Sequence, residues 1–240
     1  MKSYKKVACI IQARTGSTRL PNKVNMKIEN KPILEHIIDF LKFSKLTDEI
    51  IIATTELPED DIIEKIGIQN KVKVFRGSKN DVLSRYFFCA KQFHIDIVVR
   101  ITADNPLIDP HLVDQVIKDI LNGEYDYVSN MIEQTYPSGY LVEAFTFTTL
   151  EKIYNSKTDS YNKEHVTPDL RKNFKNYKTK NIRTPKNLER NSWRLTLDYK
   201  KDLSILKKIF KNLYRPNNYI SYESVVNFLD HNESILDNRN

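Results

Sequence analysis

The sequence predicts an α/β fold in which helices flank a mainly parallel sheet. Short apolar runs alternate with segments whose apolar residues recur at helical spacing, and polar residues follow several of the runs directly. Alternating strands and helices favour parallel pairing through crossover helices. A chain of 240 residues can bury a sizeable core, and it shows no internal repeat or low-complexity linker. We therefore predict one domain over residues 1–240.

The first half of the chain alternates regularly between the two kinds of element. Apolar residues after Pro32 recur at helical spacing, and a proline suits the first turn of a helix. By the same reasoning we expect strands at 7–11, 49–53, 72–75 and 96–101 and helices at 32–43, 58–66, 81–93 and 110–121.

The alternation is less regular after residue 124. Strands are expected at 125–128, 142–147 and 193–198, with a turn at 136–140 between the first two. Helices are expected at 159–174, interrupted at Pro168, and at 203–213, with one or two more at 221–236. The strand expected at 193–198 ends in Asp198, and another aspartate, Asp104, follows shortly after the strand at 96–101.

The composition favours a small anionic partner. The formal net charge is +7 and the pI is about 9.1, but 38 basic residues are mixed with 31 acidic ones and form no block of like charge. Phosphorylated small molecules fit this pattern better than nucleic acid does. A nucleic-acid-binding protein is the weakest of three hypotheses, because no basic and aromatic residues interleave as a base-stacking surface requires.

Apolar runs and cysteines predict the cellular location. The run at 7–11 is too short for a signal peptide, and no stretch reaches transmembrane length, so no membrane association is expected. Cys9 lies in an expected strand and Cys89 in an expected helix, each without a second cysteine at metal-binding spacing. Two isolated, buried thiols predict a cytoplasmic protein.

The stretch after the first strand, Gln-Ala-Arg-Thr-Gly-Ser-Thr-Arg-Leu-Pro-Asn-Lys at 12–23, is suited to phosphate. Its glycine lets backbone N–H groups approach an anion, its hydroxyl groups can donate, and its three cations add charge-assisted hydrogen bonds. Neither the Walker loop nor the dinucleotide fingerprint is present. The alternative is an ordinary basic surface turn. The residues concerned are Gly16, Ser17, Thr18, Arg14, Arg19 and Lys23.

Two later strand ends carry further candidates. Arg76, Gly77 and Ser78 follow the third strand, and open α/β sheets bind ligands at this edge. Asp104 follows the fourth strand and suits Mg²⁺ beside a triphosphate. The alternatives are a turn with a solvated arginine for the first segment and a helix cap for the aspartate, although Asp109 is better placed to cap.

Five motifs, taken together, resemble the cytidylyltransferase family. They are residues 10–23, 75–86, 100–110, the Glu-His-Val-Thr-Pro segment at 164–168 and the Arg-Leu-Thr-Leu-Asp segment at 194–198. The sequence is most similar to the branch named for spore-coat polysaccharide biosynthesis protein F, which is related to CMP-sialic acid and CMP-Kdo synthetases. The resemblance extends from about residue 6 to about residue 210.

The resemblance implies a Rossmann-like, nucleotide-diphospho-sugar transferase fold with an excursion at about 130–180 that helps to form a homodimer and the acceptor site. It implies transfer of CMP from CTP to an acidic sugar, with Mg²⁺, for surface polysaccharide or glycoconjugate biosynthesis. It places Asp104 and Asp198 at the metal. The nucleotide-binding residues would be Gln12, Ala13, Arg14, Gly16, Ser17, Thr18, Arg19, Lys23, Arg76, Gly77, Ser78 and Thr102.

The expected chemistry needs cations rather than a protein nucleophile. An acceptor hydroxyl attacks the α-phosphorus of CTP and expels pyrophosphate, so the protein must align the reactants and neutralise charge. Arg14 and Lys23 are the catalytic candidates for that neutralisation. No residue is assigned as the general base. The competing enzymatic hypothesis, a glycosyltransferase of similar fold, would normally show an Asp-any-Asp motif, whereas residues 102–104 hold one aspartate.

One departure from the family pattern concerns the acceptor. Many members of this branch read Gly-Leu-Asp-Val-Glu where this chain reads Gly-Tyr-Leu-Val-Glu at 139–143, so Leu141 replaces an acidic side chain. The acceptor-side candidates are Tyr136, Glu143 and His165. A histidine beside a glutamate, as at 164–165, is more often a structural residue than a catalyst.

Overall fold

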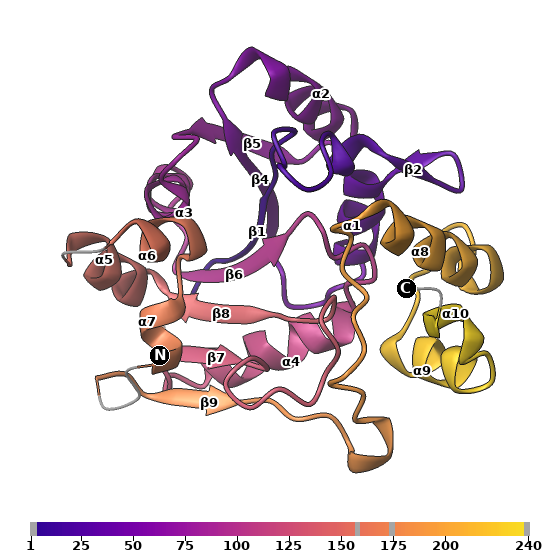
Figure 1. The fold of residues 1–240 in the computed structure, drawn as a ribbon. Helices are drawn as coiled ribbons and strands as arrows, with labels where there is room; N and C mark the ends of the chain where they lie inside the picture. Colours follow the sequence, from indigo (N-terminus) through magenta and orange to yellow (C-terminus); the bar gives the residue numbers. More distant parts are fainter. Residues whose placement is uncertain (1–3, 157–158, 173–175, 238–240) are drawn as a thin grey trace.

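A single seven-stranded sheet organises the chain (Figure 1). The computed structural model describes residues 4–156, 159–172 and 176–237. The first four strands in spatial order are parallel, whereas β8 is antiparallel to both of its neighbours and β7 and β9 are parallel to each other. The spatial order is β5 (Lys73–Gly77), β4 (Glu49–Thr55), β1 (Val7–Gln12), β6 (Ile97–Thr102), β8 (Glu143–Thr146), β7 (Tyr127–Ser129) and β9 (Thr179–Asn181).

Both faces of the sheet are buried, which explains why its central strands are apolar at successive positions. Successive β1 residues, such as Cys9 and Ile10, point to opposite faces and belong to two separate apolar clusters. The first cluster contains α1 (Ile33–Leu41), α2 (Asp61–Gln69) and α4 (Pro110–Leu121). The second contains α3 (Val82–Gln92), α5 (Phe147–Asn155) and parts of the segments around α6 (Ser160–His165) and α7 (Pro168–Lys172).

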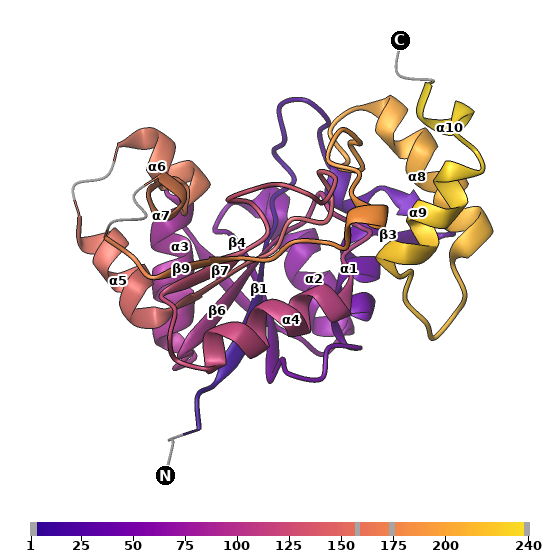
Figure 2. The same cartoon turned by 90° about the horizontal axis from the view of Figure 1, so that it is seen from below.

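The C-terminal helices extend the first cluster. Figure 2 shows α8 (Lys200–Leu213), α9 (Tyr222–Asp230) and α10 (Ser234–Asp237) on the side of the molecule away from α5 and α6. The ring of Phe210 on α8 packs 4.7 Å from that of His36 on α1. A hairpin of β2 (Lys27–Ile28) and β3 (Lys31–Pro32) precedes α1. The described helices include none that is both long and apolar enough to span a bilayer.

Most of the expected elements are present. The prediction that the fold is α/β with a mainly parallel sheet is confirmed. Asp109 caps α4 by accepting a hydrogen bond from the His111 N–H, and Asp81 caps α3 in the same way from the Ser84 N–H. Both cysteines are buried and free, as expected. The helix expected at 159–174 is divided into α6 and α7, and residues 173–174 lie outside the described part.

Two expectations about strands were wrong. Residues 193–198 form no regular strand and make only an isolated bridge between Ser138 and Arg194, because the Leu195 and Leu197 N–H groups donate to the loop carbonyls of Ser138 and Asp104. Phe147 begins α5 instead of ending a strand, because the Thr146 hydroxyl caps the helix by accepting from the Thr149 N–H. Helix α5, strand β9 and the β2–β3 hairpin were not predicted.

Gly139 packs closely against the backbone of Leu195, in the irregular segment that leads to Asp198. Its φ is +113°, and an added Cβ would lie 2.8 Å from the Leu195 carbonyl carbon. We expect Gly139→Ala to lower the free energy of unfolding by more than the roughly 1–3 kcal/mol typical of a strained backbone position, because atoms also overlap. Gly123→Ala is the matched control, since Gly123 has φ +81° with nothing within 4 Å of the added Cβ. Equal losses for both variants in urea unfolding would contradict this assignment.

Candidate active site

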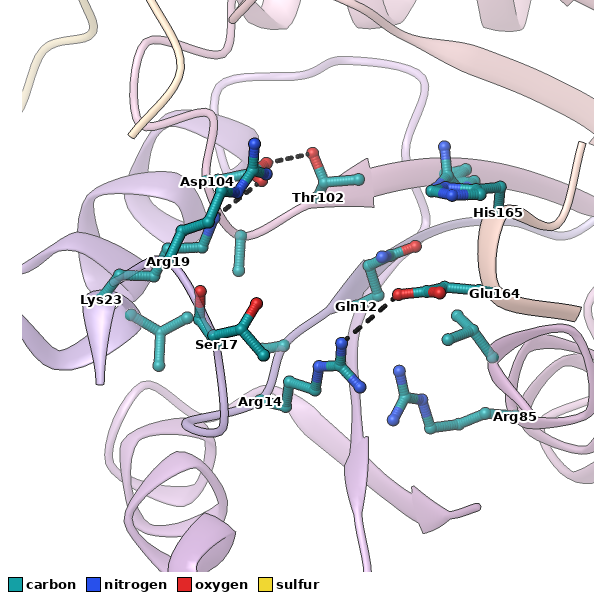
Figure 3. A pocket seen from close by; sticks show the side chains of 16 residues that line it. Gln12, Arg14, Ser17, Arg19, Lys23, Arg85, Thr102, Asp104, Glu164 and His165 are labelled. Atoms are coloured by element: carbon teal, nitrogen blue, oxygen red, sulfur yellow. Dashed lines mark hydrogen bonds and ion pairs between the residues drawn. The ribbon is translucent and has the colours of Figure 1, made fainter. Parts of the chain in front are cut away.

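A cavity of about 280 Å³ opens at the carboxyl ends of β1 and β6 (Figure 3). Gln12 and Thr102, which end these two strands, are direct partners in the sheet register. Ligand sites of open α/β sheets lie at this edge. The lining residues come mostly from the loop after β1, from α3 and β6, and from the end of α6: Gln12, Ala13, Arg14, Ser17, Thr18, Arg19, Lys23, Val24, Val82, Arg85, Arg100, Thr102, Ala103, Asp104, Glu164 and His165.

Asp60 fixes the loop at residues 12–23. The Thr15 backbone N–H and hydroxyl both donate to Asp60 Oδ1 over 2.7 Å, and the Thr55 hydroxyl donates to the other carboxylate oxygen. Burial acts to raise the pKa of Asp60, but these hydrogen bonds outweigh it and hold the pKa below its ordinary value. The loop is thus attached to the end of β4. The acidic start of residues 58–66 was the only sequence signal for this role.

Lys23 joins two aspartates that are far apart in the sequence. Its Nζ lies 3.0 Å from Asp104 Oδ2, 3.1 Å from Asp198 Oδ1 and 3.0 Å from the Leu197 carbonyl oxygen. The Arg19 guanidinium also contacts Asp198 Oδ1 at 2.8 Å. Asp202 fixes the backbone at Asp198, because its carboxylate accepts hydrogen bonds from the Asp198 and Tyr199 N–H groups. Lys23 thus lies between Asp104 and Asp198, and the role of the two aspartates at a metal stays a prediction.

The two aspartates fit a divalent cation. Burial acts to raise the pKa of Asp104, but the charge of Lys23 and the Thr102 hydroxyl, which donates over 2.6 Å, hold it below its ordinary value. Two carboxylates that already share one cation match the donor set that Mg²⁺ takes together with phosphate oxygens and water. The described residues contain no group of three or more His, Cys, Asp or Glu side chains arranged for a metal.

The opposite end of the cavity is rich in arginine. Figure 3 shows the Arg14 and Arg85 side chains directed toward the same region, near Glu164. The Arg14 guanidinium lies 3.5 Å from Glu164 Oε1. Gln12 contributes a buried side-chain oxygen that has no hydrogen-bond partner within the described chain. His165 also lines this end, and partial burial lowers its pKa.

Glu143 lies behind the cavity rather than in its lining. It is 1% exposed, and its carboxylate contacts Arg100 NH1 at 2.6 Å. It also accepts from the hydroxyls of Tyr127 and Thr167, at 2.5 and 2.6 Å. Burial acts to raise the pKa of Glu143, but Arg100 and its other partners hold it below its ordinary value. The contact orients Arg100, which does line the cavity.

We expect Glu143→Ala to cost about 3–5 kcal/mol of unfolding free energy, because it leaves Arg100 buried without its carboxylate. The pKa of Glu143 is depressed in the folded protein, so this stability is present above the ordinary pKa of 4.5 and is lost as the pH falls through the lower folded value. Urea unfolding at decreasing pH should show wild type and variant converging. Glu133→Ala, at a largely exposed side chain, is the control. A constant difference across the pH range would contradict the assignment.

The remaining candidates lie outside the cavity lining. Tyr136 packs with its ring centroid 5.0 Å from that of Tyr222, beside a separate hollow. Arg76 is directed to α2, where its NH1 contacts Asp61 at 2.7 Å and Glu64 at 2.8 Å. Gly16, Gly77, Ser78, Asp198 and Leu141 are likewise absent from the lining, although the Ser78 carbonyl accepts from Arg85.

Arg85 and Arg100 were not singled out in the sequence, although a signal was available. Each is a charged residue within an apolar pattern: Arg85 lies on the helix between inward-facing Leu83 and Tyr86, and Arg100 lies within a buried strand. A charge placed in a buried element indicates either a buried ion pair or a ligand contact.

This architecture defines a nucleotidyltransferase of the nucleotide-diphospho-sugar transferase fold. Residues 8–230 match the family model described as cytidylyltransferase, and the chain belongs to that family. The spore coat polysaccharide biosynthesis protein SpsF of Bacillus subtilis is 30% identical over 93% of each chain. The chain is thus an enzyme of the CTP-dependent class, as the five motifs predicted.

Two solved structures support the fold. A cytidylyltransferase from Leptospira borgpetersenii superposes with a TM-score of 0.93, at 34% identity over 99% of each chain. A CMP:2-keto-3-deoxy-manno-octonic acid synthetase solved with CTP superposes with a TM-score of 0.66, at 15% identity, over 87% of this chain and 99% of its own. The second likeness concerns the fold alone. Family membership favours the nucleotidyltransferase hypothesis over the glycosyltransferase one.

Proposed function

We propose that this enzyme transfers CMP from CTP to an acidic sugar, or to a related acid-bearing acceptor, and releases pyrophosphate. The pathway would be the synthesis of a surface polysaccharide or glycoconjugate. The observation that carries the proposal is the contact of one lysine, Lys23, with both Asp104 and Asp198 beside the loop at 12–23. This arrangement supplies carboxylates for a metal and cations for a triphosphate within one small volume.

The nucleotide would lie along the loop that follows β1. The Gln12 oxygen, which has no partner among the described residues, is available to a ligand donor group, and the hydroxyl-bearing residues Ser17, Thr18 and Thr102 line the cavity. Arg14, Arg19 and Lys23 would bind phosphate oxygens and stabilise the departing pyrophosphate. Mg²⁺ held by Asp104 and Asp198 would neutralise phosphate charge when bound. Arg76, Gly77 and Ser78 would act through the position of their loop.

The acceptor would enter at the arginine-rich end of the cavity. Arg14, Arg85 and Arg100 outnumber the single carboxylate of Glu164 in the lining there, which favours an acceptor that carries an acid group. His165 is the acceptor-side candidate that reaches the lining. Glu143 would contribute by orienting Arg100, and Tyr136 would require a movement of its segment. A homodimer and a cytoplasmic location stay predictions.

A panel of substrates tests the proposal. The protein is incubated with each of the four nucleoside triphosphates, Mg²⁺ and sialic-like, Kdo-like or phosphonate acceptors, and pyrophosphate is measured. We expect release with CTP only when a suitable acceptor is present. Release with another triphosphate in preference to CTP would overturn the choice of nucleotide. If none of the four triphosphates releases pyrophosphate with any acceptor of the panel, the result would count against the proposed acceptor class.

A further inference from the structure

Arg85 is a buried cation that has no carboxylate partner among the described residues. It is 2% exposed, yet it lines the cavity. Across residues 4–156, 159–172 and 176–237, no Asp or Glu oxygen lies within ion-pair distance of its guanidinium. Its NH1 donates to the Ser78 carbonyl oxygen over 3.2 Å, and its Nε is buried without a hydrogen-bond partner in the described part of the chain.

Arg100, the neighbouring arginine of the cavity lining, does have a carboxylate partner. Its NH1 lies 2.6 Å from the Glu143 carboxylate, which itself receives two hydroxyl hydrogen bonds. A neutral carbonyl such as that of Ser78 does not replace a counter-ion, because desolvating a guanidinium is costly unless a negative charge compensates it. Within the residues that the structure describes, Arg85 therefore lacks the counter-ion that its burial requires.

Burial is the main cause that lowers the pKa of Arg85, and the positive charge of Arg14 acts in the same direction, whereas Tyr86 and Asp60 act to raise it. Figure 3 shows both guanidinium groups directed toward the same part of the cavity, with Lys23 and Asp104 at the opposite end. Two cations that face one space and repel each other form a site for an anion.

We propose that Arg85 binds substrate, and that its missing counter-ion is an oxyanion of the bound ligand, which it shares with Arg14. The ligand chemistry is a phosphate or carboxylate oxygen, contributed either by the nucleotide or by the acid group of the acceptor. That the ligand is a nucleotide or an acid-bearing acceptor rests on the proposed function. Binding would pair the free Nε–H of Arg85, and Arg14 would exchange its contact with the exposed Glu164 for the ligand.

This role makes a prediction that a structural role does not. Arg85→Met removes an uncompensated buried charge and replaces it with an apolar chain that fills irregular space well, so the ligand-free protein should be as stable as wild type or more stable. Substrate binding should weaken at the same time. A structural arginine would give the opposite result, with lost stability and unchanged affinity of the folded protein.

The experiment compares the variants Arg85→Met and Arg85→Lys with a control variant, Arg190→Met. The Arg190 guanidinium pairs with Asp230 at 2.6 Å and lies outside the cavity lining. Calorimetry gives the dissociation constant for CTP with Mg²⁺, steady-state kinetics gives the KM for the acceptor, and urea unfolding gives stability. For Arg85→Met we expect one substrate to bind roughly 10- to 100-fold more weakly, the range for a lost charged hydrogen bond. Arg85→Lys should recover only part of the lost substrate affinity, because a lysine keeps the charge but lacks the planar set of N–H donors of a guanidinium.

The two arms identify the source of the anion. Weaker CTP binding assigns the nucleotide phosphate, and a raised acceptor KM with unchanged CTP binding assigns the acceptor acid group. If neither changes, or if Arg85→Met loses stability while both substrate parameters hold, the proposal is wrong. If wild type binds no CTP, the proposed function fails separately. Inorganic tripolyphosphate then serves as the probe, and equal or absent binding by wild type and Arg85→Met overturns the role of Arg85.

Discussion

Replacing Asp104 by Asn is expected to lower pyrophosphate release from CTP by at least about 100-fold, toward the background. An amide keeps the size and the Thr102 hydrogen bond but removes the charge that the proposed Mg²⁺ site needs, and electrostatic groups of this kind are typically worth roughly 2.7–4 kcal/mol in the transition state. Asp104 lies 3.0 Å from Lys23, so the substitution also weakens the position of that cation.

The control for Asp104→Asn is Asp39→Asn. Asp39 also contacts lysines, Lys31 at 2.7 Å and Lys42 at 3.1 Å, but it lies on α1 outside the cavity lining. That variant should release pyrophosphate at the wild-type rate. Undiminished release by Asp104→Asn, with its folding verified by circular dichroism, would remove the metal-binding role of this aspartate.

Lys23→Met is expected to have two opposite effects. Turnover should fall by roughly 10²–10³-fold, because the cation proposed to stabilise pyrophosphate is lost. Affinity for Mn²⁺ in the absence of nucleotide should rise, because Lys23 no longer neutralises Asp104 and Asp198. Electron paramagnetic resonance of free Mn²⁺ measures the second effect directly.

The pair of readouts separates Lys23 from a purely structural lysine. Lys31→Met is the control, because Lys31 pairs with Asp39 at 2.7 Å away from the cavity and should leave both turnover and Mn²⁺ binding unchanged. A Lys23→Met protein that loses turnover without binding Mn²⁺ more tightly would show that the two aspartates do not share a cation site.

The sequence predicted the fold well where hydrophobic patterns were strong. The runs that became β1, β4 and β6 are apolar at successive positions because both faces of each strand are buried. The prediction was wrong at residues 193–198, whose pattern is strand-like although their backbone N–H groups donate to loop carbonyls at Ser138 and Asp104 rather than to a strand of the sheet. Periodicity reports which side chains are buried, whereas strand pairing depends on neighbours far away in the chain.

The candidate site was predicted in part for the same reason. Residues at the ends of β1 and β6 could be grouped from sequence, because the carboxyl ends of parallel strands meet at one edge. The direction of a side chain could not be predicted: Arg76 follows a strand end too, yet it contacts Asp61 and Glu64 on α2. Nor could spacing show that Glu143 would be buried against Arg100.

The fate of the individual phosphates of CTP tests the central proposal most directly. The enzyme is incubated with Mg²⁺, an acceptor from the active class and CTP labelled at either the α- or the γ-phosphorus, and the products are separated. The proposal predicts that the α-label enters a CMP-linked product while the γ-label leaves as pyrophosphate, both in equal amounts. Release of the γ-label as inorganic phosphate, or of the α-label as free CDP, would contradict attack at the α-phosphorus and with it the proposed function.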